Sequence, residues 1–277
     1  MTLPEVPSLP GPALLFCPAD RPDRYAKALA AADAVILDLE DGVGADRKNE
    51  ARATLAASAL DPARVIVRVN ATGTDEHAAD IAALRATGYR LIMLPKSETR
   101  AQLDELGGDW RVVALCETAL GIVNAAEIAA ARNVIAVMWG AEDLIASMRG
   151  RTSRFPDGRY RDVALHARSA VLLAASAHGR PAVDAVYVNI PDLGGLAAEA
   201  EDAAASGFTL KGCIHPSQVA VVRKAFQADE AQAAWARRVI AAARGAGGRD
   251  KGAIKVDGQM IDAPLIRQAE AILASLR

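Results

Sequence analysis

The chain contains eight short apolar runs that alternate with alanine-rich helical stretches, and this repeat constrains its fold more than any other feature. The runs are rich in β-branched residues without clean polar alternation, which is typical of parallel strands covered on both faces. Eight such units in 277 residues predict a (β/α)8 TIM barrel rather than an open doubly wound sheet. The predicted strands are Ala13–Pro18, Val35–Leu39, Arg64–Asn70, Leu91–Lys96, Arg111–Glu117, Val134–Gly140, Val183–Asn189 and Phe208–His215.

The stretches between the runs carry the residues of helices, and the two ends of the chain lie outside the barrel. Residues 1–12 form an N-terminal extension, residues 13–228 the TIM-barrel catalytic domain, and residues 229–277 a C-terminal helical and extended tail. We expect that tail to pack on a neighbouring subunit. The predicted barrel helices are Pro22–Ala32, Lys48–Leu60, Thr74–Ala86, Thr99–Leu106, Gly121–Ala131, Asp162–Ala177 and Leu193–Ser206.

The composition excludes several classes of protein. A net charge of −2, from 32 basic and 34 acidic residues, argues against a partner that is a nucleic acid or a membrane surface. No apolar stretch reaches the roughly 18–20 residues of a membrane span, and the N-terminus does not resemble a secretory signal, so a cytoplasmic protein is expected. Three cysteines within apolar runs, Cys17, Cys116 and Cys213, are predicted to be buried thiols.

Six of the apolar runs end on residues that can do chemistry. In a parallel barrel the carboxyl ends of the strands form one face, so these residues are expected to meet in a single site. The sequence therefore predicts an enzyme more clearly than it predicts a substrate. The strand-end residues are Glu40 and Asp41, Arg68 and Asn70, Lys96, Glu117, Glu142 and Asp143, and His215.

Glu117 and Asp143 are the leading candidates for metal ligands. They follow the fifth and sixth strands, which are neighbours in a barrel. Mg²⁺ takes one or two protein carboxylates and fills its other positions with water and substrate oxygens. The alternative is that each carboxylate caps the helix that follows it, and the residues alone leave the two interpretations even.

Arg68 lies inside the third strand, where a charge is costly unless it is paired. Its guanidinium could hold a substrate carboxylate or stabilise an enolate oxygen. It could also form an ion pair with Glu40 or Asp41, and both interpretations can hold together. Period-two geometry places Asp38 and Glu40 on one face, and we expect one or more of these acids to fix Arg68 or a metal-bound water.

A third candidate site follows the first strand. Arg21, Arg24 and Lys27 surround the start of a helix that is predicted to begin at Pro22. A helix N-terminus with basic side chains suits an anionic group, phosphate in particular. Ordinary capping of the helix by Asp20 is the alternative.

Eight segments in register carry a resemblance to a known family. They are Phe16–Arg24, Val35–Val43, Val67–Asn70, Met93–Lys96, Cys116–Thr118, Met138–Leu144, Ile214–Gln218 and Gly258–Asp262. With these motifs the chain resembles the citrate lyase β-subunit-like proteins of the HpcH/HpaI aldolase superfamily, over nearly its whole length after about Ala13.

The resemblance implies a reaction and a set of roles. It implies a TIM barrel and a Mg²⁺-dependent carbon–carbon lyase. Such an enzyme cleaves or forms a 3-hydroxyacyl-CoA thioester, giving an acetyl-CoA-type product and a 2-keto acid such as oxaloacetate, pyruvate or glyoxylate. Glu117 and Asp143 would bind Mg²⁺, with Glu117 and Arg68 also contacting the keto acid. Asp262, from the tail of a neighbouring subunit, would act as the acid/base in a homo-oligomer, a trimer or a hexamer.

Further residues are candidates for catalysis and for CoA binding, and two alternative functions remain open. Glu40 and Asp41 join Arg68 and Asp262 as candidate catalytic residues, and Arg21, Arg24 and Lys27 are candidates for binding coenzyme A. One alternative is a Mg²⁺-dependent aldolase that acts on free 2-keto acids and needs no CoA site. The other is a lyase subunit that is active only with partner chains.

Overall fold

The computed structural model describes residues 9–245 and 253–276. Of the predicted N-terminal extension, residues 1–8 lie outside the described part of the chain. The chain divides into two compact units, Met1–Val222 and Arg223–Arg277.

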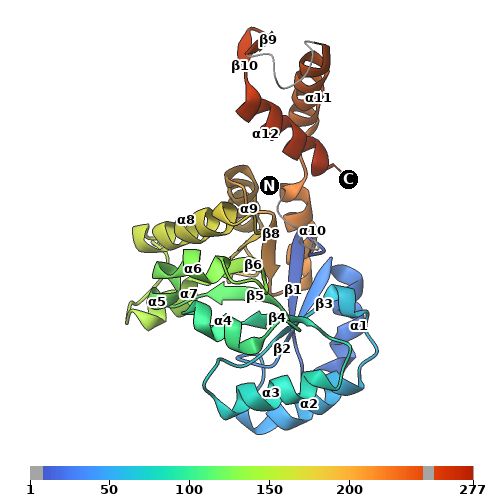
Figure 1. Cartoon of the computed structure of the whole chain (residues 1–277), viewed down its shortest axis with the longest axis vertical. Helices are drawn as coiled ribbons and strands as arrows, with labels where there is room; N and C mark the ends of the chain where they lie inside the picture. The colour runs from blue at the N-terminus through green and yellow to red at the C-terminus, as the bar shows by residue number, and fades with distance from the viewer. Residues whose placement is uncertain (1–8, 246–252, 277) are drawn as a thin grey trace. The chain divides into compact units, whose positions relative to one another are not determined.

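The first unit is a closed barrel of eight parallel strands, which follow one another around the barrel in chain order (Figure 1). The first and last strands pair with each other, which closes the sheet. The predicted TIM-barrel fold is therefore confirmed. The strands are β1 Ala13–Pro18, β2 Ala34–Asp38, β3 Val65–Arg68, β4 Leu91–Leu94, β5 Arg111–Cys116, β6 Val134–Trp139, β7 Ala182–Asp184 and β8 Leu210–Cys213.

Helices follow the strands and cover the outside of the barrel (Figure 1). The α-helices are α1 Pro22–Ala31, α2 Lys48–Ala57, α3 Asp75–Arg85, α4 Arg100–Leu106, α5 Ala119–Val123, α6 Ala125–Ala129, α7 Ala141–Ser147, α8 Asp162–Ala177, α9 Leu193–Ser206 and α10 Pro216–Phe226. Two short 3-10 helices, Ala45–Arg47 and Pro62–Arg64, precede α2 and β3.

Several predicted elements extend beyond the observed ones, among them the strands Arg64–Asn70 and Phe208–His215 and the helix Lys48–Leu60. Two others differ more. The predicted helix Gly121–Ala131 is wrong as a single helix, because it is interrupted at Asn124, whose Nδ2 donates to the Glu98 carbonyl at 2.8 Å. The predicted strand Val183–Asn189 is too long, because β7 ends at Asp184. Beyond that point the backbone carbonyls of Ala185 and Tyr187 accept hydrogen bonds from side chains of Lys211 and Gln218.

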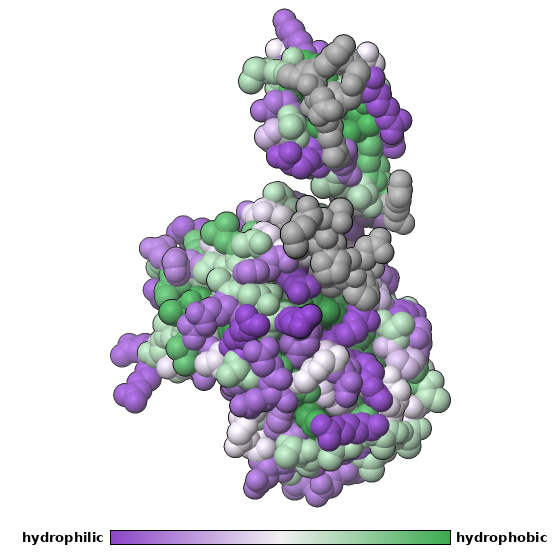
Figure 2. All heavy atoms as spheres, viewed as in Figure 1, coloured by the Kyte–Doolittle hydropathy of each residue, from purple (hydrophilic) through white to green (hydrophobic). Residues whose placement is uncertain are grey.

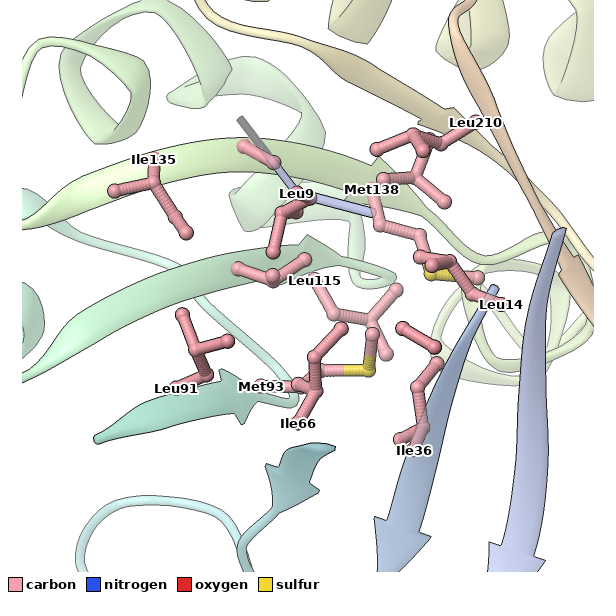
Figure 3. Packing of buried hydrophobic residues seen from close by; sticks show 14 residues of the cluster. Leu9, Leu14, Ile36, Ile66, Leu91, Met93, Leu115, Ile135, Met138 and Leu210 are labelled. Carbon is pink, nitrogen blue, oxygen red and sulfur yellow. The ribbon is translucent and has the colours of Figure 1, made fainter. Parts of the chain in front are cut away.

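The barrel interior is filled by apolar side chains. Leu14, Ile36, Ile66, Met93 and Leu115 are almost completely buried there, with other members of one cluster (Figure 3). Because apolar side chains fill the interior, an active site is expected at the carboxyl ends of the strands. The inward-facing positions recur every second residue along a strand. The residue two positions after the last buried apolar side chain of a strand therefore also faces inward, at the carboxyl end of the barrel, which we call the mouth.

The second unit has its own apolar core. It contains the helices α11 Glu230–Gly245 and α12 Ala263–Ala274 and the antiparallel hairpin of β9 Ile254–Val256 and β10 Gln259–Ile261. Apolar side chains of both helices and of the hairpin pack together: Ala236, Val239, Ala243, Val256, Ile261, Ile266 and Ala269. The predicted packing of the tail on a neighbouring subunit stays a prediction.

The surface of the barrel carries a mixture of side chains. Figure 2 shows polar and apolar residues interspersed over the visible face of the first unit. Among the described helices, none has both the length and the apolar character that a membrane span requires.

Candidate active site at the barrel mouth

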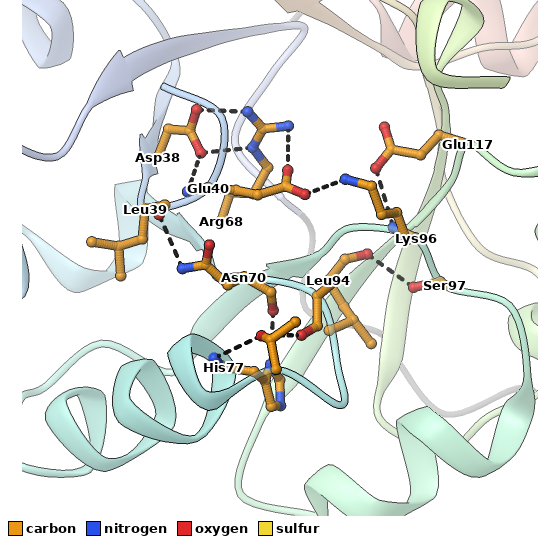
Figure 4. A network of polar contacts seen from close by, with 12 residues as sticks. Asp38, Leu39, Glu40, Arg68, Asn70, His77, Leu94, Lys96, Ser97 and Glu117 are labelled. Atoms are coloured by element: carbon orange, nitrogen blue, oxygen red, sulfur yellow. Dashed lines mark hydrogen bonds and ion pairs between the residues drawn. The ribbon is translucent and has the colours of Figure 1, made fainter. Parts of the chain in front are cut away.

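A layer of charged side chains closes the apolar interior at the carboxyl ends of the strands. Ile36, Ile66 and Leu115 are buried in the core cluster, and the residues two positions further along are Asp38, Arg68 and Glu117. The same period that buries the apolar side chains therefore turns these three toward the barrel axis. All three belong to one network of polar contacts (Figure 4).

Arg68 is held by two carboxylates. Its Nε and Nη2 donate to the two oxygens of Asp38 at 2.7 and 2.6 Å, and its Nη1 lies 2.9 Å from Glu40 Oε2. The guanidinium also lies 5.1 Å from the centre of the Phe16 ring. The predicted ion pair with Glu40 is present, and Asp38 adds a bidentate one. Asp41 is exposed, and its catalytic role stays a prediction.

Asp38 is fixed by the backbone that follows β2. The N–H groups of Glu40 and Gly42 donate to its two oxygens at 2.9 and 2.8 Å. A Cβ on Gly42 would lie only 2.4 Å from Asp38 Oδ2, so this close approach requires a glycine. Asp38 thus links the loop after β2 to Arg68, so the position of the guanidinium depends on that of the loop.

Glu40 lies between two cations. Oε1 accepts from the Lys96 ammonium, and Oε2 faces Arg68. The Arg68 contact is an ion pair without hydrogen-bond geometry, so Oε2 is a buried oxygen with no hydrogen-bond donor among the described residues. Burial raises the pKa of Glu40, although Arg68 and Lys96 oppose the shift. Burial lowers the pKa of Arg68, but Asp38 and Glu40 outweigh it and hold that pKa above its ordinary value.

Glu117 is the most perturbed carboxyl group of the mouth. It is 3% exposed, and its Oε1 accepts from the Lys96 N–H at 3.1 Å. A Cβ on Gly140 would lie 2.9 Å from Glu117 Oε2, so the side chain packs against bare backbone. Burial, then repulsion by Asp143 and Glu40, raises the pKa of Glu117 to about 8.

Asp143 lies in the first turn of α7 and is half-buried. Its charge contributes to the raised pKa of Glu117. The N-cap residues of α5 and α7 are Thr118 and Gly140. Neither carboxylate is therefore an N-cap residue, but Asp143 lies in the first turn of α7, where a negative charge is favourable.

The donor set fits Mg²⁺. Within residues 9–245 and 253–276, no group of three or more His, Cys, Asp or Glu side chains is arranged to hold a metal, as zinc would require. Mg²⁺ requires only one or two carboxylates, because water and substrate oxygens complete its shell. A divalent cation beside Glu117 and Asp143 would also relieve the repulsion that raises the pKa of Glu117.

A buried polar network supports the loop behind the site. The Lys48 ammonium donates to the carbonyls of Leu39 and Glu40 at 2.6 and 2.8 Å, and to Asn70 Oδ1 at 2.7 Å. Asn70 Nδ2 in turn donates to Asp80 at 2.7 Å. The network fixes the turn that carries Glu40. Sequence reasoning missed Lys48, whose one signal was a lysine at the start of a helix after an acidic strand end.

The candidate CoA residues lie on the turn after β1 and on α1, and the Ala19 N–H of that turn donates to the Asp38 carbonyl at 3.0 Å. Arg21 pairs with Asp23, and Arg24 and Lys27 are exposed on α1. The N-cap residue of α1 is Arg21, and Asp20 instead pairs with Arg47 at 2.6 Å. Capping by Asp20 is therefore wrong, and the basic group remains a candidate for an anion.

Asp262 belongs to the second unit, where it is the N-cap residue of α12. Its Oδ1 accepts from the Leu265 N–H at 3.5 Å, and the side chain is half-buried. An asparagine could make the same cap, which allows the carboxylate chemistry to be tested apart from the helix.

Comparisons with known proteins identify the family of the chain. Residues 13–216 match the family described as HpcH/HpaI aldolase/citrate lyase. The chain is 56% identical to a citrate lyase subunit beta-like protein of Mycobacterium tuberculosis (strain CDC 1551 / Oshkosh), over 95% of this chain and 94% of that one. It is 31% identical to the mitochondrial citramalyl-CoA lyase of Homo sapiens, over 95% and 84%.

A solved structure resembles the whole chain. It is the crystal structure of the protein CitE from Mycobacterium tuberculosis in complex with magnesium, acetoacetate and coenzyme A. The two superpose with a TM-score of 0.91 at 55% sequence identity, covering 96% of this chain and 98% of that one. The predicted family is thereby confirmed: this chain belongs to the HpcH/HpaI aldolase/citrate lyase family.

Proposed function

We propose that this protein is a Mg²⁺-dependent carbon–carbon lyase. It cleaves or forms a 3-hydroxyacyl-CoA thioester, and the products of cleavage are an acetyl-CoA-type thioester and a 2-keto acid. The observation that carries the proposal is the buried carboxyl group of Glu117, which is repelled by half-buried Asp143 and belongs to the same polar network as Arg68 (Figure 4). The citramalyl-CoA lyase relative and the CitE complex with magnesium and coenzyme A support it.

Glu117 and Asp143 would hold the metal. When bound, Mg²⁺ supplies a Lewis acid that polarises the carbonyl oxygen of the keto acid. The protein contributes a rigid frame for it, because the Lys96 N–H and the bare backbone of Gly140 fix the Glu117 carboxylate.

Arg68 would bind the carboxylate of the keto acid. A guanidinium has five N–H groups, and Arg68 donates two of them, one from Nε and one from Nη2, to Asp38. The edge between Nη1 and Nη2 still carries N–H groups, and such an edge matches a carboxylate bidentately. The side chain is 11% exposed, so this edge would bind its ligand in a largely dry environment.

Asp262 of a neighbouring subunit would move the proton. In the cleavage direction the substrate hydroxyl must lose its proton, and the acetyl-CoA-type enolate must gain one. Asp262 would serve both steps, because a carboxylate outside the metal pair is free to take up and release a proton. This role implies a homo-oligomer, and we propose a trimer or a hexamer.

Coenzyme A would be bound by Arg21, Arg24 and Lys27 at the start of α1. The two alternative functions differ from this proposal in whether the protein binds CoA and whether it turns over substrate alone. An aldolase acting on free 2-keto acids would keep the metal pair and Arg68 but would not bind CoA. A partner-dependent subunit would show no turnover alone. The CoA in the CitE complex favours the thioester lyase.

The test is a substrate screen of the purified protein. Citramalyl-, malyl- and citryl-CoA are each incubated with Mg²⁺, and the products are identified by mass spectrometry, with EDTA and the Glu117→Gln variant as controls. We expect one thioester to release an acetyl-CoA-type product and a keto acid, and both controls to stop the reaction. Turnover that survives EDTA would contradict the metal role. Binding of Mg²⁺ and keto acid without turnover would favour the alternatives.

A further inference from the structure

Lys96 contacts both halves of the candidate site. The keto-acid half contains Arg68 and Glu40, and the metal half contains Glu117 and Asp143. Its ammonium pairs with Glu40 Oε1, and its backbone N–H donates to Glu117 Oε1 at 3.1 Å. Figure 4 shows Lys96 between these two carboxylates. Because Glu40 in turn pairs with Arg68, a single residue links the guanidinium to the candidate metal ligand.

The backbone of Lys96 is in an unusual conformation. Its φ is 49°, in the left-handed region that residues with a Cβ rarely adopt. Such a conformation persists only where the surrounding structure fixes it, and it is frequent at functional sites. In Lys96 it allows the N–H and the side chain to reach two different carboxylates.

The turn around Lys96 is clamped from several directions. The Ser97 N–H donates to the Leu115 carbonyl of β5 at 3.0 Å, and the Ser97 hydroxyl donates to the Leu94 carbonyl at 2.9 Å. The start of α5 packs directly on the turn, since a Cβ on Gly121 would lie 2.4 Å from the Ser97 carbonyl oxygen. The position of Lys96 is therefore fixed by β4, β5 and α5 together.

We propose that Lys96 is a positioning residue that keeps Glu40 off the edge of the Arg68 guanidinium that binds the keto-acid carboxylate. The inference rests on the function proposed above. Its ammonium draws one oxygen of Glu40 away from Arg68. Without that charge, Arg68 would be the one cation paired with Glu40 among the described residues. Both Glu40 oxygens would then turn toward the guanidinium and occupy the edge that a substrate carboxylate requires.

The test separates the two halves by measuring two affinities. Lys96→Met removes the ammonium but keeps the backbone N–H to Glu117. Calorimetry with Mg²⁺ alone, and then with pyruvate in the presence of saturating Mg²⁺, reports each half. We expect pyruvate binding to weaken about tenfold, the loss expected for one charge-assisted contact, while Mg²⁺ binding changes less than about threefold. Lys96→Arg, which keeps a cation, should recover most of the pyruvate affinity.

Two further variants control for backbone strain. Lys96→Gly adopts the left-handed conformation without cost, so it should lose pyruvate affinity as Lys96→Met does, without a lower melting temperature. Arg149→Met changes an exposed basic residue with φ 60° outside the network and should leave both affinities unchanged. Normal pyruvate affinity in Lys96→Met and Lys96→Gly would overturn the inference. An unaltered protein that binds neither Mg²⁺ nor pyruvate would instead overturn the proposed function, and this inference with it.

Discussion

Two glycines show how closely single residues are fitted around the charged layer. Gly42 approaches Asp38, and Gly140 approaches Glu117, each with too little room for a methyl group. In both places the absent side chain lets a carboxylate lie flat against the backbone. The positions of Arg68 and of the candidate metal ligand therefore depend on residues that have no chemistry of their own.

Gly42→Ala should reduce activity without unfolding the barrel. The new Cβ would lie 2.4 Å from Asp38 Oδ2, so Asp38 must move and Arg68 loses part of its support. We expect kcat/KM to fall about tenfold, equivalent to about 1.4 kcal/mol of transition-state stabilisation. Steady-state kinetics with the substrate found in the screen measure this change.

Gly44→Ala is the matched control, two residues further along the same loop. Its φ is −60°, and the nearest atom to a new Cβ is a side-chain oxygen of Asp46, which can move. We expect near-normal kinetics. Equal losses in the two variants would mean that the loop as a whole, and not the Asp38 contact, limits activity.

The pKa of Glu117 predicts how stability depends on pH. The folded protein raises this pKa from 4.5 to about 8, because burial favours the neutral carboxyl group. Its contribution to stability is therefore complete below about pH 4.5 and is lost as the pH rises through about 8. Without Mg²⁺ the melting temperature should fall between about pH 4.5 and pH 8 and level off above that. The increase on adding Mg²⁺ should grow over the same interval, because the ion binds the deprotonated form.

Glu117→Gln tests this assignment, because it removes the titrating group at nearly constant size. The pH-dependent part of the Mg²⁺ effect should disappear, and activity should fall on the order of 10²-fold or more. A variant that keeps the same pH-dependent response to Mg²⁺ would assign the effect to a different group.

At this scale the sequence predicted residue types better than it predicted contacts. Arg68, Glu117 and Asp143 could be named because each follows or ends an apolar run. The left-handed backbone of Lys96 could not be predicted, because it depends on tertiary contacts with β5 and α5. The strongest partner of Arg68 proved to be Asp38, since strand register decides which acid of the cluster lies opposite it.

At the scale of elements, the short helix α5 links local stability to the site. Its N-cap residue, Thr118, directly follows Glu117. The Thr118 Oγ1 accepts from the Gly121 N–H at 3.1 Å and donates to Glu98 at 2.8 Å. The start of the helix thus fixes the end of the loop that carries Glu117.

Thr118→Ala should therefore affect both stability and metal binding. Loss of the cap costs about 1 kcal/mol, which corresponds to a fall of about 2–4 °C in melting temperature for a domain of this size. We expect weaker Mg²⁺ binding as well, since Glu117 would lose part of its support. Thr118→Ser keeps the capping oxygen and serves as the control. Weaker Mg²⁺ binding in Thr118→Ser would show that the threonine methyl group, not the cap, is responsible.

Elements with strong periodicity were predicted well, and the weak ones were not. The barrel closes with eight strands as expected. The end of β7 was misplaced because the apolar residues after Asp184 look like a continuing strand in sequence. In the structure their carbonyls are bonded by Lys211 and Gln218 instead of by a neighbouring strand. The break between α5 and α6 depends on the Asn124–Glu98 contact, which sequence periodicity cannot reveal.

At the scale of the whole molecule, the proposed division of the site between two subunits can be tested by mixing. Asp262→Asn keeps the cap of α12 but removes the carboxylate, and Glu117→Gln removes the candidate metal ligand. Each variant alone should be nearly inactive. Co-expressed with different affinity tags and purified as mixed oligomers, they should regain activity, because some sites then combine an intact Glu117 with an intact Asp262 of the partner chain.

The outcome distinguishes the arrangements clearly. In a random mixture of the two variants, about a quarter of the sites can receive both intact residues, so activity should recover to a comparable fraction of the unaltered protein's. The control is a mixture of the two single-variant oligomers, which are refolded and purified separately and combined without subunit exchange. Mixed oligomers that stay inactive would mean that each chain uses its own Asp262, or that Asp262 takes no part.

The three cysteines have a practical consequence for spectroscopy. Cys17, Cys116 and Cys213 are all buried, and burial raises the pKa of Cys17 to about 11 and that of Cys116 to about 12. Thiolate is the reactive form, so maleimide and nitroxide reagents should not react with these native thiols at neutral pH. A cysteine introduced at exposed Met260, two residues before Asp262, could then carry a single probe. Distances measured between such probes would report how the subunits of an oligomer are arranged, in the otherwise unaltered chain.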